Sequence, residues 1–240
     1  MVSVRVTLFT IAAAASLFAD PPAPKISPEQ RADILMARKM YREAIDVYSQ
    51  APDNSPSRWN KLGIAYHQLQ DLTDAKKSYE RAIKLDPHFG EPRNNLGTIF
   101  YSQRSFRSAI REYKRALRIM PDSASVYSNL GTAYFARQDY KRASENYAKA
   151  LKIDPDVFEH HNSYGVILQD HNVTERAKFH YYLAKMYAKE GMTDRALQCI
   201  RKALEEGFGE RKKFVEEPEF AALRQNLEFQ QILKSEPRVL

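Results

Sequence analysis

The sequence predicts an all-α protein, built as a solenoid of antiparallel helix pairs. Three observations support this fold class. Glycine recurs every 34 residues, two alanine columns and a tyrosine column follow in the same register, and proline closes three of the units. The columns are Gly63, Gly97, Gly131 and Gly165; Ala75, Ala109, Ala143 and Ala177; Tyr79, Tyr113, Tyr147 and Tyr181; Ala82, Ala116, Ala150 and Ala184; and Pro87, Pro121 and Pro155. A fixed period of this length is typical of repeat architectures, in which stacked units bury one another.

Composition fits this class and excludes others. The chain has 240 residues, of which 43% are hydrophobic and 28% are charged, so it can bury a core. A single cysteine excludes an intramolecular disulfide and a cysteine-rich zinc site. The formal net charge of +7 permits anionic partners without identifying one.

The first 19 residues have the composition of a secretory signal peptide, with Arg5 before an uncharged stretch from Val6 to Phe18 and a small residue, Ala19, at its end. These 13 apolar or weakly polar residues are too few to cross a bilayer. Residues 20–26 form a proline-rich leader. We therefore expect an exported protein, periplasmic or secreted, in a Gram-negative type of envelope if the source is bacterial. An uncleaved anchor and an accidental apolar stretch are the alternatives.

Each unit is predicted to be a helical hairpin. Trp59, Leu62 and Tyr66 mark one apolar stripe at helical spacing, and the second helix carries Ala75 and Tyr79. The second helix ends before Pro87, since the residue preceding a proline is disfavoured in helical conformation. Glycine in the first helix lets the two axes approach, and the tyrosine fills the space between them.

These residues resemble the tetratricopeptide repeat (TPR) family, whose W-x2-L-G-x2-Y…A-x3-F/Y-x2-A…P pattern is complete in the unit from Trp59 to Pro87. The pattern recurs from Leu96 to Pro121 and from Leu130 to Pro155. The resemblance implies a right-handed superhelix of about five to six repeats over residues 27–206. It also implies a non-catalytic scaffold, without cofactor, that holds a protein or peptide partner in its concave groove.

The ends depart from the period. Upstream, Ala32, Ala44 and Tyr48 lie 31 residues before their counterparts, and Ser55 is placed to cap the next helix. Downstream, one helix over about residues 174–189 fits two roles, as the second helix of a fifth unit or the first helix of a sixth. An odd number of helices, with a final packed helix over residues 192–205, would reconcile them. Residues 207–240 are expected to cap the open end, the alternative being a tail that binds a partner. The proposed capping side chains are Phe214, Phe220, Leu223, Leu227, Phe229 and Leu233.

The groove is expected to be lined by the first helix of each unit. Asparagine amides there could bind the backbone of an extended peptide, with aromatic side chains between them, as in the asparagine ladders of some TPR superhelices. The alternative is that the asparagines cap helix ends or face water. Substituting Asn95 and Asn129 by alanine should then weaken peptide binding and leave the thermal midpoint nearly unchanged. The predicted groove residues are Asn60, Lys61, His67, Asn94, Asn95, Tyr101, Asn129, Phe135 and Asn162.

Basic residues concentrate on the second helices, which should form the convex face. Such a band could meet an anionic partner, or it could be a solvated surface on which Glu80, Glu112 and Glu145 are interspersed. No nucleic acid is expected, and membrane association is expected to be weak or through a partner only. The basic residues are Lys76, Lys77, Arg81, Lys84, Arg107, Arg111, Lys114, Arg115, Arg118, Lys141, Arg142, Lys149 and Lys152.

No motif for catalysis or metal binding stands out. The histidines near residue 170, with Asp170 and Glu175, match no common metal spacing, and Cys199 is expected to be a buried, inert thiol. The second functional hypothesis is a self-associating structural adaptor with an empty groove. The sequence leaves the oligomeric state and the identity of the partner open.

Overall fold

The computed structural model describes residues 26–50, 54–159 and 173–235, and within these ranges every regular element is a helix. The all-α prediction is therefore confirmed. None of the described helices is long and apolar enough to span a membrane. The helices are α1 (Pro28–Ala37), α2 (Tyr41–Ser49), α3 (Pro56–Gln68), α4 (Leu72–Leu85), α5 (Glu91–Ser102), α6 (Phe106–Ile119), α7 (Ala124–Ala136), α8 (Tyr140–Ile153), α9 (Val173–Lys189), α10 (Thr193–Glu205), α11 (Lys212–Glu216), the 3-10 helix η2 (Pro218–Leu223) and α12 (Leu227–Lys234).

Ten of these helices pair into five hairpins that share one turn geometry. In each turn a single residue adopts a left-handed backbone conformation, with φ between 57° and 73°. The next residue donates its N–H to a carbonyl five residues earlier, as Ser105 does to Phe100 and Met192 does to Tyr187. The left-handed residues are Lys39, Gln70, Arg104, Gln138 and Gly191.

Side-chain caps start several of the helices. The Ser55 hydroxyl accepts the Arg58 N–H at 3.2 Å, as the sequence predicted, and the Asp71 carboxylate accepts the Asp74 N–H at 3.1 Å. These bonds satisfy donors that have no partner within the helix.

The glycine columns allow the helices of a hairpin to touch, as predicted. A Cβ atom added at Gly97 would lie 2.5 Å from the Tyr113 ring, and one at Gly63 would lie 2.6 Å from the Tyr79 ring. Tyr79, Tyr113 and Tyr147 are completely buried. Each tyrosine thus fills the space that its glycine leaves, which fixes the register between the two helices.

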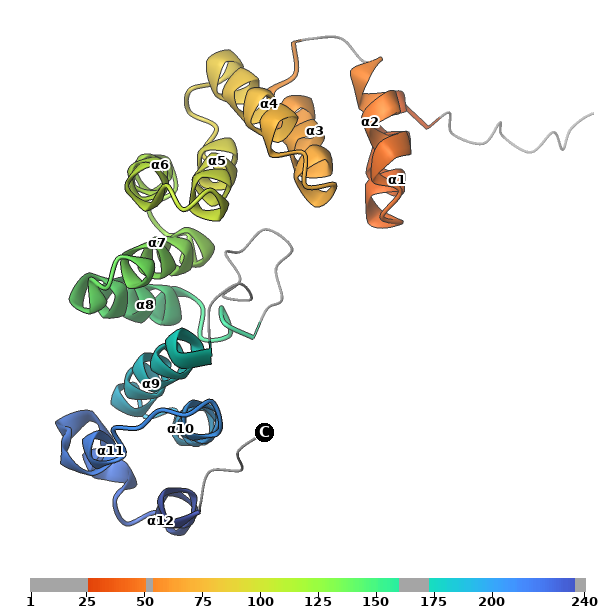
Figure 1. Ribbon diagram of the computed structural model, residues 1–240. Coiled ribbons are helices and arrows are strands. Elements are labelled where there is room, and N and C mark those ends of the chain that lie inside the picture. The colour runs from red at the N-terminus through yellow and green to blue at the C-terminus, as the bar shows by residue number, and fades with distance from the viewer. Residues whose placement is uncertain (1–25, 51–53, 160–172, 236–240) are drawn as a thin grey trace, which may run out of the picture.

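The hairpins follow one another along an arc (Figure 1). The first helices α3 and α5 lie on its inner side, and the second helices α4 and α6 lie on its outer side. Neighbouring first helices contact each other, α3 with α5 and α5 with α7. Over the two hairpins α3–α4 and α5–α6, the inner surface is therefore built from first helices and the outer surface from second helices (Figure 1).

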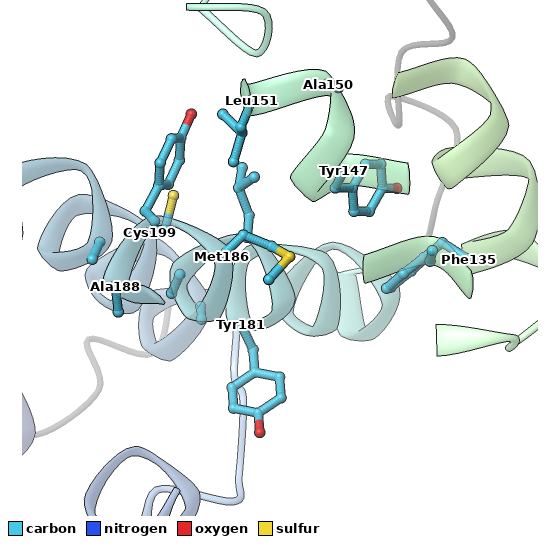
Figure 2. Close-up of a cluster of buried hydrophobic side chains, with 14 of the residues drawn as sticks. Phe135, Tyr147, Ala150, Leu151, Tyr181, Met186, Ala188 and Cys199 are labelled. Atoms are coloured by element: carbon cyan, nitrogen blue, oxygen red, sulfur yellow. The ribbon is translucent and has the colours of Figure 1, made fainter. Parts of the chain in front are cut away.

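Helix α9 takes the first-helix role, because it forms its hairpin with α10 through the shared turn at Gly191. Its opposite faces are both buried. Phe179 and Tyr182 pack on Phe135 of α7, while Tyr181 stacks on Phe208 at 4.4 Å between ring centroids. Figure 2 shows Tyr181 pointing away from Met186 across the helix. Any first helix of the unit containing Gly165 falls outside the described residues.

The C-terminal segment covers the end of the stack, as predicted for most of its side chains. Phe214, Phe220, Leu223 and Phe229 are buried in the same core as Tyr181, and Leu233 packs against it. Leu227 departs from the prediction, because it is 75% exposed at the start of α12. The additional helix α11 places Phe214 against Tyr181, a contact between elements that the repeat period does not predict.

Candidate functional site

The predicted groove asparagines form pairs between neighbouring first helices. The Asn95 amide donates to the Asn60 side-chain oxygen at 3.0 Å, and the Asn129 amide donates to the Asn94 side-chain oxygen at the same distance. All four side chains are buried, with between 2% and 9% of each residue exposed. We call Asn60, Asn94, Asn95 and Asn129 the asparagine row. The row ties α3, α5 and α7 together along the inner side of the arc.

Threonines extend this polar row toward the second helices. Thr132 accepts a hydrogen bond from the Tyr147 hydroxyl at 3.2 Å, and the Thr98 and Tyr113 hydroxyls lie 3.3 Å apart. Burial raises the pKa values of both tyrosines well above their ordinary range, so both phenols stay protonated. The polar groups between the helices are thus largely bonded to one another.

Lys61 joins the inner surface to the first hairpin. Its ammonium lies 2.8 Å from Asp33 and 3.3 Å from Glu29, both on α1. Burial lowers the pKa of Lys61, but the bond and charge of Asp33 and then of Glu29 outweigh it, so the pKa is raised. Lys61 therefore stays protonated, and its ammonium group is held by ion pairs to α1.

The predicted aromatic groove residues lie largely inside the protein. Tyr101 packs on Phe106 at 5.3 Å between ring centroids and is 8% exposed, and Phe135 is 4% exposed among the rings of the next elements. His67 is half-buried on α3, and burial lowers its pKa. Asn162 lies outside the described residues.

Two accessible residues of the inner helices lie outside the set of predicted groove residues. Ile64 and Ser128 are part-exposed, and they occupy the same columns as Thr98 and Asn94, respectively. The repeat period gives these columns, but it could not show that both residues stay accessible while the asparagines pair.

Comparison with known protein families gives three matches. The family described as "Tetratricopeptide repeat" matches residues 56–89 and 124–157, and the family described as "TPR repeat" matches residues 97–136. These segments coincide with the hairpins α3–α4 and α7–α8 and with helix α5 through helix α7. The chain is a TPR repeat protein.

Solved structures similar to this TPR protein share its fold. A crystal structure of MamA is 23% identical, with a TM-score of 0.52, and the match covers 75% of this chain and 96% of that one. A second, titled "Crystal structure of MamA protein", is 22% identical, with a TM-score of 0.52 over 80% and 93% of the chains. MamA 41-end from Desulfovibrio magneticus RS-1 is 19% identical, with a TM-score of 0.53 over 76% and 94%. No curated protein sequence matches the chain.

A cavity of about 630 Å³ lies beside the second of the described TPR hairpins, where α2 meets α3 and α4. Trp59 and Tyr66, which mark the apolar stripe predicted for this helix, are both part-exposed at this cavity. The shortened spacing between the first two units is the signal that marks this junction as irregular. The lining residues are Ser49, Arg58, Trp59, Leu62, Tyr66, Asp74, Lys77, Ser78 and Arg81.

Reactive groups are few in the described parts of the TPR array. No cluster of histidine, cysteine, aspartate and glutamate there could hold a metal ion, while His160, His161, Asp170 and His171 fall outside those residues. Cys199 is buried, and burial raises the pKa of its thiol to about 12, so it stays protonated. His180 lies 2.6 Å from Glu206, yet burial outweighs that carboxylate and lowers the pKa of the imidazole. TPR repeat proteins are typically non-catalytic scaffolds.

Proposed function

We propose that this protein is a non-catalytic scaffold that holds a segment of a partner protein along the inner surface of its TPR array. The asparagine row is the observation that supports this proposal. Each pair joins one N–H to one oxygen, so the amides of Asn60, Asn94 and Asn95 keep further hydrogen-bonding capacity. The pairs also hold neighbouring helices in fixed positions, which lowers the entropy cost of binding.

Two tyrosine substitutions separate the inner surface from the outer one. Ser128→Tyr adds bulk beside the asparagine row, and Thr73→Tyr adds the same bulk at an exposed position of α4. Peptides selected from a displayed library on the full chain would be titrated against both variants. We expect Ser128→Tyr to weaken binding at least tenfold, or about 1.4 kcal/mol, while Thr73→Tyr changes it little. Equal affinity for the wild type and Ser128→Tyr would contradict the proposal.

Self-association is the second candidate, and one residue favours it. Ile34 on α1 is 41% exposed, whereas Ala65, Ile99 and Ala133, at the equivalent position of the next three hairpins, are completely buried. In each of those three hairpins the preceding hairpin packs over this position. The stretch 26–50 has four basic and four acidic residues, so a second copy meets no net repulsion there. Because the C-terminal end is covered by its own capping segment, only the N-terminal ends of two copies would meet. The assembly would therefore stop at a head-to-head dimer.

Light scattering after size-exclusion chromatography tests this candidate. A dimer should dissociate in Ile34→Glu and persist in Leu227→Glu, which adds the same charge at an exposed leucine of the opposite end. A monomeric wild type at micromolar concentration would remove self-association and leave the inner-surface proposal standing.

We further propose that the chain is exported to a periplasmic or extracellular location. The composition of residues 1–19, which lie outside the described residues, supports this proposal. Sequencing the mature N-terminus from native cells should give a start close to Asp20. A chain that begins at Met1 in the cytosol would contradict it.

A further inference from the structure

The outer helices carry more positive charge than the whole chain. Helices α4, α6 and α8 contain thirteen Lys and Arg against four Asp and Glu, a formal net charge of +9, whereas the full sequence has +7. The remainder of the chain is therefore slightly acidic. On α4 and α6 this positive charge lies on the outer side of the arc (Figure 1), and α8 is the equivalent second helix of the next hairpin.

Of the acidic side chains expected to intersperse this surface, Glu80 and Glu145 are exposed as predicted, whereas Glu112 is buried. Glu112 is only 4% exposed and lies within an arginine cluster. Its carboxylate is 2.8 Å from Arg115, 3.6 Å from Arg111 and 3.7 Å from Arg93. Helix α6 consequently presents five cations to solvent without an exposed acid of its own. The buried Glu112 carboxylate offsets part of this positive charge, while the charged groups that α6 exposes to solvent are all cations.

The 34-residue period sets the outer cations in rows that cross the helices. Arg81, Arg115 and Lys149 form one row, and Lys84, Arg118 and Lys152 form a second row one helical turn away. Five of the six residues are exposed and Arg81 is part-exposed. Each row therefore takes one cation from each of three successive second helices.

We infer that the surface formed by α4, α6 and α8, here called the outer basic face, is a second docking surface, for an extended acidic segment of a partner protein. Arginine binds carboxylates through two parallel hydrogen bonds, which suits the exposed guanidinium groups. The face curves outward, so a flexible chain can follow its rows while a flat bilayer touches only a strip. Among the described exposed large apolar side chains this face carries Ile153 alone, at the end of α8, which is too little to enter a membrane. Tyr79 and Tyr113 are buried, so neither can stack on nucleic-acid bases.

Two variants of equal net charge test this inference. Lys84→Gln, Arg118→Gln and Lys152→Gln together remove one row, and none of these residues has an ion pair with a described residue. Lys189→Gln, Lys212→Gln and Lys234→Gln together remove three exposed cations from other elements. Neither triple variant changes any other charged residue of the chain. Thermal unfolding should show that each variant is folded.

Fluorescence anisotropy with a labelled oligoglutamate peptide would measure binding at low and physiological salt. We expect the row variant to bind about tenfold more weakly, and the control triple variant to change less than about twofold. The inner-surface variant Ser128→Tyr should bind oligoglutamate like the wild type, so this test is independent of the proposed function. Equal losses in both triple variants, or no binding by the wild type, would overturn the inference. So would tighter binding to phosphatidylglycerol vesicles or to a single-stranded oligonucleotide than to oligoglutamate.

Discussion

The side-chain amides of Asn60 on α3 and Asn95 on α5 are hydrogen-bonded to each other, and both side chains are buried. Removing one partner leaves a buried polar group without its bond, which costs about 1–3 kcal/mol. We therefore expect Asn95→Ala and Asn60→Ala each to lower the free energy of unfolding by about that amount. The double variant should lose less than the sum, because the second substitution removes the stranded group.

Urea unfolding of the four proteins in this cycle measures the coupling energy. Asn54→Ala, at an exposed position before α3, should change stability by less than about 0.5 kcal/mol. Strict additivity would contradict the pairing. Since the amides of Asn95 and Asn129 both hold neighbouring helices, we expect their joint replacement by alanine to lower the thermal midpoint rather than leave it nearly unchanged.

His67 makes stability depend on pH. Burial lowers the pKa of its imidazole below the ordinary value of 6.5. Below pH 6.5 the unfolded chain binds a proton at this histidine that the folded chain does not bind. The contribution of His67 to the free energy of unfolding is therefore highest above pH 6.5 and decreases as the pH falls through the pKa of the folded state. His67→Gln should reduce the change in the free energy of unfolding between pH 7.5 and 5. Chemical denaturation at several pH values would measure this change. His88→Gln, at an exposed histidine, should leave the slope unchanged.

Each hairpin turn contains one residue in left-handed conformation, but only the last turn uses glycine. A residue with a side chain is disfavoured in this conformation by about 1–2 kcal/mol, and glycine avoids this cost. Glycine loses more conformational entropy on folding, so its net gain is smaller than that amount. We expect Arg104→Gly to raise the free energy of unfolding by about 0.5–1 kcal/mol. Gly191→Ala should lower it.

Thermal and urea unfolding would measure both changes. Arg111→Gly, at an exposed position in the interior of α6, should destabilise by about 1 kcal/mol because helix interiors disfavour glycine. Stabilisation by both arginine substitutions, or by neither, would contradict the role of the turn.

The repeat period predicted the helix pairs, their turns and the contacts of Gly97 with Tyr113, because a column of like residues marks one place in a repeated unit. It could not predict the asparagine pairs, since spacing gives the side of a helix but not the 3.0 Å approach of two amides. It also missed the burial of Glu112, whose partners Arg93 and Arg115 come from different helices. The candidate peptide contacts at Asn60 and Asn95 remain predictions.

The whole stack depends on the cover at its C-terminal end. Lys185 on α9 lies 2.8 Å from Glu217 and 3.2 Å from Glu219, which belong to the capping segment. Burial lowers the pKa of Lys185, but these two carboxylates more than reverse the effect and raise it. Lys185→Gln leaves both carboxylates part-buried without a cation. We expect it to cost about 1–2 kcal/mol and to loosen the cap before the array unfolds.

Limited proteolysis with mass spectrometry would detect this loosening as early cleavage beyond Gly207. Lys189→Gln, at an exposed position one helical turn further on, should keep the wild-type pattern. An unchanged cleavage pattern in Lys185→Gln would show that the aromatic contacts of Phe214 and Phe220 hold the cap alone.

The single tryptophan stands at the joint between the first hairpin and the remainder of the array. Trp59 packs against the cluster of Ala32, Ala44 and Tyr48, with the Arg58 guanidinium 4.7 Å above its ring. Solenoids exchange stability only between adjacent units, so an end unit can detach while the others stay stacked. Tryptophan emission, excited at a wavelength that tyrosine does not absorb, therefore reports that first detachment and is insensitive to events at the far end.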